Sequence, residues 1–159
     1  MINKILVLLF FASSTCFSQN WIVVNESIVK IEIDISSIKK DENKIYSWIK
    51  YTYINKENRD NYINEEINFI KDSDYLSTKN KIDKSLKFKE FYYNIEYRVF
   101  DIKNKKSQLL QIIYYSKEGN VIDRYKYEEK YSEYNLIIPE SRGMLIFESL
   151  IEITIDRLK

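Results

Sequence analysis

The chain has 159 residues, with 25 lysines and arginines against 24 aspartates and glutamates, no histidine and one cysteine. A single domain is the expectation at this length. The net charge of +1 argues against a nucleic-acid-binding protein, which needs a strongly basic surface. Without histidine, and with a single cysteine, the chain lacks the residues of Ser-His-Asp and Cys-His catalytic sites and of imidazole-ligated metal sites.

Residues 1–19 are predicted to be a signal peptide. Lys4 forms a short basic region, residues 5–12 are apolar, and small and polar residues follow up to Gln19, which is the pattern of a secretory signal and too short for a comfortable membrane span. We therefore expect an exported domain over residues 20–159, located in the periplasm, on the outer surface or outside the cell. Lipidation of Cys16 is an open alternative. Lys4 is the only charged residue of the signal, so the mature domain carries no net charge.

Most of the remaining chain has the pattern of β-strands. In residues 28–35 the apolar side chains of Val29, Ile31 and Ile33 alternate with charged ones, as in a strand with one buried face. Similar patterns with turn residues between them predict further strands. The predicted strands are residues 21–24, 28–35, 44–54, 86–102, 107–116 and 121–125. They predict one antiparallel sheet of about six strands.

Residues 55–84 differ from these segments, because they are rich in Asn, Asp, Lys and Glu and poor in core residues. Tyr62, Ile63, Ile67 and Ile70 could form one short amphipathic helix. Otherwise the segment is a long exposed connection, and its composition favours a mobile one.

The C-terminal residues 137–158 have helical periodicity. Pro139 suits the first helical position, and Met144, Phe147, Ile151 and Ile155 fall on one face. Such a helix is unstable alone and needs an apolar surface to cover. The order of strands followed by a helix indicates an α+β fold, with a single antiparallel sheet and the C-terminal helix packed on one face.

No set of residues predicts an enzyme, a metal site or a cofactor site. Asp101 and Asp123 are expected to be turn or surface acids, and residues 72–74 resemble only half of a calcium loop, without its glycine. Two glycines in the whole chain leave no phosphate-binding loop. We therefore predict a non-enzymatic protein without catalytic, cofactor-binding or metal-ligating residues, and a small carboxylate enzyme is the competing hypothesis.

One lysine cluster is a candidate binding site. Its members are Lys79, Lys81, Lys84, Lys87 and Lys89. Such a cluster can attract an acidic partner or a sulfated glycan, or it can be the solvated edge of a strand, where lysine prevents edge-to-edge aggregation. The fourteen tyrosines allow two interpretations in the same way, a binding surface or ordinary strand residues.

Six motifs in order resemble the surface-adhesin protein E family of bacterial outer-surface proteins. Trp21-Ile-Val resembles the family's opening strand, and Ile137-Ile-Pro-Glu-Ser resembles its Ile-Pro-Pro-Gly-Ser entry to the helix. The other four motifs are Ile33-Asp-Ile-Ser-Ser-Ile, Ile45-Tyr-Ser-Trp-Ile-Lys, Asp101-Ile-Lys-Asn and Tyr114-Tyr-Ser-Lys-Glu-Gly. The segment 55–84 is longer than in the family, and Glu140 stands where the family has glycine.

The resemblance implies a protein partner, since members of the family are adhesins that bind host extracellular-matrix proteins such as vitronectin and laminin. The alternative is a periplasmic or envelope module that binds another bacterial protein. The family joins helix and sheet by a disulfide, whose positions fall here on Ile102 and Ile151, so the resemblance implies an apolar contact there. Phe147 and Ile155 would contribute to the same contact. Strict alternation along the strand places Ile102 on the other face of the sheet from Val99. A contact between Ile102 and the helix therefore predicts a bulge or a strand end between these two residues.

Overall fold

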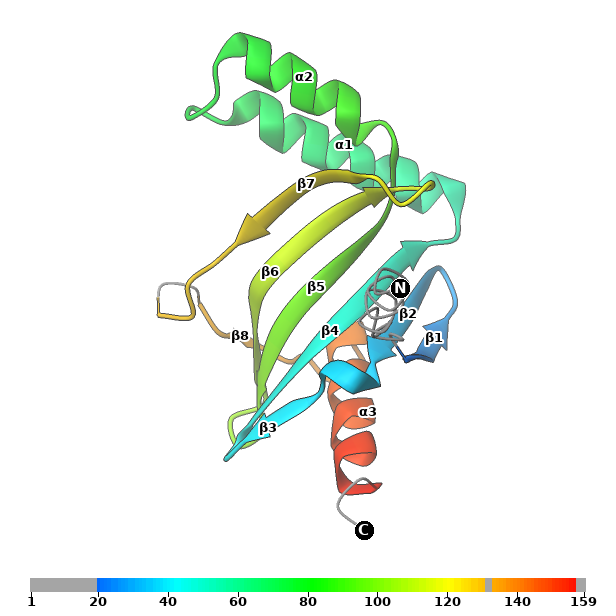
Figure 1. Ribbon diagram of the computed structural model, residues 1–159, viewed down its shortest axis with the longest axis vertical. Coiled ribbons are helices and arrows are strands. Elements are labelled where there is room, and N and C mark those ends of the chain that lie inside the picture. The colour runs from blue at the N-terminus through cyan, green and yellow to red at the C-terminus, as the bar shows by residue number, and fades with distance from the viewer. Residues whose placement is uncertain (1–19, 131–132, 157–159) are drawn as a thin grey trace, which may run out of the picture.

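A computed structural model describes residues 20–130 and 133–156, so the predicted signal peptide and Cys16 lie outside the described residues. Its elements in chain order are β1 Trp21–Glu26, β2 Val29–Asp34, the 3₁₀ turn Ile35–Ser37, β3 Lys39–Asp41, β4 Lys44–Tyr53, α1 Lys56–Asp72, α2 Thr78–Phe88, β5 Phe91–Asp101, β6 Lys106–Ser116, β7 Val121–Lys126, β8 Asn135–Leu136 and α3 Arg142–Asp156 (Figure 1). Within the described ranges, no helix combines the length and apolar character that crossing a membrane requires.

The strands form one antiparallel sheet, as predicted. Six of them follow the order β1-β2-β4-β5-β6-β7, while the short strands β3 and β8 pair with β4 and β6. Two segments predicted to be loops therefore contain strands: β3 lies within 38–43 and β8 ends the connection 126–135. Both are too short to show a periodic pattern, and their pairing with a longer neighbour defines them.

The strand register defines an inner face of the sheet. Ile33 lies opposite Ile49, Ile49 opposite Glu96, and Glu96 opposite Ile112. Directly opposed residues point to the same side, so this row runs across four strands on one face. Val29, Ile31, Ile33, Ile45 and Ile49 are all at most 1% exposed, which confirms the alternation predicted for β2 and β4.

All three helices cover this inner face, at opposite ends of the strands (Figure 1). One apolar cluster joins Phe147 and Leu150 of α3 to Ile45 of β4 and Phe100 of β5. A second cluster joins Ile67, Ile70 and Phe88 of α1 and α2 to Phe91, Ile112 and Tyr114 of β5 and β6. The α+β fold with α3 on one face is therefore as predicted, but α3 covers only part of that face.

A polar band, buried at Asn94 and half-buried at Glu96 and Arg98, crosses the inner face between the two clusters. The Arg98 side chain donates to Glu96 at 2.5 Å, and Asn94 Nδ2 donates to the second Glu96 oxygen at 3.0 Å. Asn94 is 2% exposed. Burial raises the pKa of the nearby Tyr51 hydroxyl, which is hydrogen-bonded with Arg98. Sequence alternation gave no sign of this band, because charged residues inside a strand normally face solvent.

The segment 55–84 is not a mobile connection: it forms most of a helical hairpin. Asn55 and Ser77 cap the two helices, each accepting a backbone N–H three residues later, as N-cap residues do. The predicted strand 86–102 was also wrong at its start, since α2 continues to Phe88. The alternative of an amphipathic helix at Tyr62, Ile63, Ile67 and Ile70 is confirmed by α1, which buries Ile67 and Ile70. The strand start was wrong because Phe88, at 1% exposure, is buried at the end of α2 by contact with residues distant in the sequence.

The buried side of α3 differs from the predicted one. Ile146, Phe147, Leu150 and Thr154 are buried, whereas Ile155 is 50% exposed, so the predicted contact of Ile155 with the sheet is wrong. Ile102 and Ile151 are both partly buried against the cluster that contains Phe147. Apolar residues cover more than half of the circumference of α3, so periodicity alone left its orientation undecided.

The helix also begins later than predicted. Pro139 lies in a turn in which Ser141 N–H donates to Ile138 O at 3.3 Å, and the Ser141 hydroxyl then accepts from Met144 N–H. Glu140, the third residue of this turn, has φ +60°. This is the conformation that favours glycine.

The outer face of the sheet carries paired aromatic residues. Tyr93, Ile95, Tyr97 and Val99 share this face, opposite residues of β4 such as Trp48, while Phe91 lies on the inner face beyond a register shift. Tyr93 stacks on Tyr115 at 4.8 Å and Trp48 lies 5.0 Å from Tyr97 between ring centroids. These tyrosines therefore act as cross-strand pairs of the sheet.

Of the two features predicted between Val99 and Ile102, a bulge or a strand end, the structure has the strand end, since β5 ends at Asp101, and no register shift lies between Val99 and Asp101. The register shift lies instead opposite Tyr97 and Arg98, where β6 carries one extra residue, Leu110. The alternation from Phe100 to Ile102 then brings Ile102 to the inner face without any irregularity.

We predict that Leu150→Ala lowers the free energy of unfolding by about 2–5 kcal/mol, because Leu150 is fully buried and its loss leaves a cavity. Ile155→Ala should change it by less than about 0.5 kcal/mol. Urea denaturation measures both. Equal losses would contradict the orientation of α3.

We predict that Glu140→Gly stabilises the protein by about 0.5–1 kcal/mol, because glycine removes the cost of the left-handed conformation. The matched control is Glu90→Gly, at an exposed turn position whose φ is not positive, which should not stabilise. Thermal denaturation of both variants measures the difference.

Candidate functional site

The structure places all five predicted binding lysines in or directly after α2. At about 3.6 residues per turn, they point in different directions and do not form one patch. Lys79 and Lys87 are exposed, Lys84 faces the sheet, and Lys81 faces α1. The alternative of a strand edge is wrong, since these residues are helical.

Two of the five, Lys81 and Lys89, line a groove between α1 and α2. This α1–α2 groove has a volume of about 360 Å³ and is lined by Ile67, Lys71, Thr78, Lys81, Ile82, Ser85, Leu86 and Lys89. Its apolar part is open to solvent, with Ile82 56% and Leu86 55% exposed. An open apolar groove on a small domain is typical of an interaction site.

The charges of the α1–α2 groove are all positive. Lys71, Lys81 and Lys89 belong to its lining, which contains no acid. Lys81 also holds the hairpin together, since its ammonium donates to Lys71 O at the end of α1, at 2.7 Å. Ser85 adds a buried hydroxyl that has no hydrogen-bond partner in the described part of the chain. The groove therefore offers apolar contact and positive charge.

Sequence reasoning missed Lys71, Ile82, Ser85 and Leu86. The spacing of Ile82 and Leu86, four residues apart, was an available sign of a helical apolar stripe. This sign was overlooked because Leu86 was taken as the first residue of the predicted strand 86–102.

Lys84 is not available for a partner. It donates to Asp123 at 2.7 Å and to the Tyr125 hydroxyl at 3.3 Å. Burial alone would lower the pKa of Lys84, but the hydrogen bonds to Asp123 and Tyr125 outweigh it and raise the pKa. This lysine therefore attaches α2 to β7, and Asp123 is an ion-pair partner.

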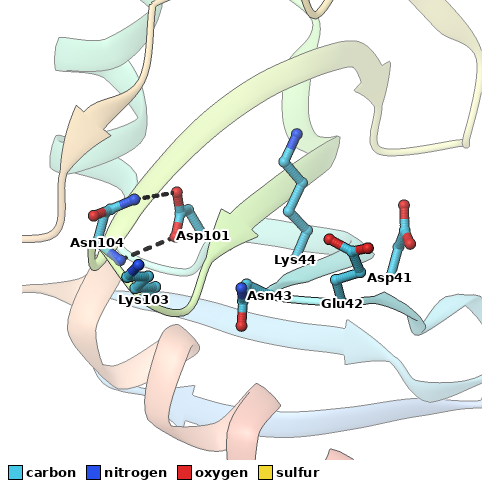
Figure 2. A pocket seen from close by; sticks show the side chains of 7 residues that line it. All are labelled: Asp41, Glu42, Asn43, Lys44, Asp101, Lys103 and Asn104. Carbon is cyan, nitrogen blue, oxygen red and sulfur yellow. Dashed lines mark hydrogen bonds between the residues drawn. The ribbon is translucent and has the colours of Figure 1, made fainter.

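A second hollow, of about 350 Å³, lies between the β3–β4 and β5–β6 turns (Figure 2). Its lining residues are Asp41, Glu42, Asn43, Lys44, Asp101, Lys103 and Asn104. Figure 2 shows Asp101 on one side and Asp41 and Glu42 on the other, so the carboxylates do not converge. Across residues 20–130 and 133–156, no group of three His, Cys, Asp or Glu could hold a metal ion.

Two charged groups of this second hollow, Asp101 and Lys44, have local partners. Asp101 accepts from the backbone and side chain of Asn104 at 2.9 and 2.7 Å, which lowers the pKa of Asp101 and confirms that it is a turn acid. Lys44 donates to Glu129 at 2.6 Å, and the hydrogen bonds to Glu129 and Tyr134 raise the pKa of Lys44. Neither Asp101 nor Lys44 is therefore free to bind a ligand.

One carboxylate on the other side of α1 has a perturbed pKa. Burial raises the pKa of Glu66, hydrogen bonds from the Tyr62 and Tyr114 hydroxyls lower it in part, and the negative charges of Glu65 and Asp123 raise it further. Glu66 thus carries a charge that the folded protein disfavours.

Comparison with known proteins shows no more than a similar fold. No protein-family model matches the chain, and no curated protein matches its sequence. Among solved structures, the chain is similar to the crystal structure of protein E from non-typeable Haemophilus influenzae. The TM-score is 0.41 and the identity 10%, over 78% of this chain and 69% of that chain. Values this low establish neither family membership nor function.

We predict that Glu66→Gln stabilises the protein at neutral pH. A carboxyl whose folded pKa exceeds its ordinary value of 4.5 disfavours folding above that range, so the stabilisation should shrink as pH falls towards 4.5. Melting temperatures measured across this range test it. Glu148→Gln, at an exposed position of α3, should leave the profile unchanged, and a gain from Glu66→Gln that persists in acid would contradict this explanation.

Proposed function

We propose that residues 20–159 form a non-enzymatic binding domain of an exported protein, and that the α1–α2 groove binds an acidic segment of a partner protein. The observation that carries this proposal is the groove itself, with exposed Ile82 and Leu86 at its centre and Lys71, Lys81 and Lys89 around them.

The occupant that fits this groove is an amphipathic helix with acidic residues beside its apolar face. Apolar side chains one turn apart would cover Ile82 and Leu86, as in other helix-in-groove complexes. Carboxylates on either side would meet the three ammonium groups.

We propose a host extracellular-matrix protein as the partner, following the resemblance of the six sequence motifs to the protein E adhesins. A bacterial envelope protein is the competing partner, and the same groove chemistry would serve it. The test must therefore identify the site and the partner separately.

The experiment compares two double variants of the exported chain for binding to immobilised vitronectin, to laminin and to a synthetic acidic amphipathic helix. Lys71→Glu with Lys89→Glu reverses two charges of the groove. Lys79→Glu with Lys87→Glu reverses two exposed charges outside its lining, so both variants have the same net charge. We expect the groove variant to bind about tenfold more weakly, and the control to stay within about twofold of wild type.

The peptide reports on the groove, and the matrix proteins report on the partner. If both double variants lost the same binding affinity at unchanged melting temperatures, binding would depend on general electrostatic attraction and not on the groove. Binding of the peptide without saturable binding of any matrix protein would support the groove as a binding site and contradict a matrix protein as the partner.

A further inference from the structure

A third hollow lies on the opposite side of α1 from the α1–α2 groove. Its volume is about 460 Å³, and its lining residues are Glu65, Glu66, Phe69, Tyr114, Tyr125 and Tyr127. We call this set the aromatic cage. Four of its six residues are aromatic and two are acids, contributed by α1, β6, β7 and the residue after β7.

We propose that the aromatic cage is a binding site for a quaternary alkylammonium group. The face of an aromatic ring attracts a cation within about 6 Å of its centroid, and two carboxylates add negative charge to the same hollow. No Lys or Arg of residues 20–130 or 133–156 forms an ion pair with Glu65 or Glu66.

The hydrogen bonds of Glu66 favour a quaternary over a primary ammonium ion. The Tyr62 and Tyr114 hydroxyls already donate to this carboxylate, so fewer acceptor positions remain for the N–H groups of a primary amine. A quaternary ammonium ion needs no acceptor, since it carries no N–H group. It interacts with the charge of the carboxylates and with the ring faces alone.

The protein already makes one contact of this type beside the cage. The Lys84 ammonium lies 5.1 Å from the centroid of the Tyr125 ring and is neutralised by Asp123 at 2.7 Å. Asp123 therefore has its own cation, whereas Glu65 and Glu66 have none that forms an ion pair among the described residues. The exposure of the rim, with Phe69 71% and Tyr127 41% exposed, gives a ligand access without unfolding.

The test is a calorimetric titration of the protein with tetramethylammonium chloride, with sodium chloride as the salt control. We expect saturable binding with one site per chain. Tetramethylammonium should bind more tightly than methylammonium. Choline should bind, and 3,3-dimethylbutanol, its uncharged isostere, should bind at least about fivefold more weakly, because it lacks the charge.

Three variants locate the site. Phe69→Leu, Tyr127→Ala and Glu66→Gln should each weaken tetramethylammonium binding about fivefold, and the first two change exposed residues whose loss should leave the fold intact. Tyr75→Ala is the matched control, because Tyr75 is 98% exposed and lies outside the cage. Lys71→Glu with Lys89→Glu should also leave this binding unchanged, which separates the cage from the α1–α2 groove.

Absence of saturable binding to the wild-type protein would overturn the proposal, as would equal binding by the Tyr75→Ala and Tyr127→Ala variants or equal affinity for choline and its isostere. The protein is also tested for binding to phosphatidylcholine vesicles. Co-sedimentation with these vesicles that tetramethylammonium inhibits would identify a lipid headgroup as the source of the cation, and binding of free choline alone would identify a small molecule.

Discussion

The constraint on which the structure depends is that a single sheet with one apolar face must have that face covered. Ile31, Ile33, Ile45 and Ile49 are at most 1% exposed, and no disulfide is possible with one cysteine in the chain. Burial of apolar surface has to hold helix and sheet together. Ile102 and Ile151 are partly buried against the same apolar cluster.

The inner face is covered in two separate places, and this division shapes the rest of the molecule. α3 covers one end of the strands and the α1–α2 hairpin covers the other, while Glu96, Arg98 and Asn94 occupy the space between. A buried ion pair contributes little net stability. Replacement of Glu96 or Arg98 would leave an unpaired, half-buried charge, so the band restricts which residues can stand between the two apolar clusters.

The helical hairpin carries both sites that we propose. One side of α1 buries Ile67 and Ile70 against the sheet. Its remaining sides help to form the lysine-lined groove with α2 and the aromatic cage with β6 and β7. The two sites have opposite charge and lie on different sides of one helix, so a cationic and an anionic group could bind at the same time. Lys84 and Asp123 lie between α2 and β7 and join the hairpin to the sheet.

The sequence by itself determined the sheet, the strands β2 and β4, the turn role of Asp101 and the presence of a C-terminal helix. Each of these follows from local periodicity or local hydrogen bonds, such as those between Asp101 and Asn104. The resemblance to an adhesin family also came from the sequence, and the solved structures add at most a similar fold to it. The sequence also showed the lysine cluster. It did not show which of these lysines line the groove, which one forms an ion pair and which face solvent.

Only the tertiary structure decided which side of α3 is buried, that residues 55–84 form a helical hairpin, and that Lys71, Ile82 and Leu86 share a groove with Lys81 and Lys89. The physical reason is common to all three. Each depends on contacts between residues far apart in the sequence, and the burial of Phe88, Leu150 and Tyr114 in those contacts outweighs the local preferences from which a sequence can be interpreted.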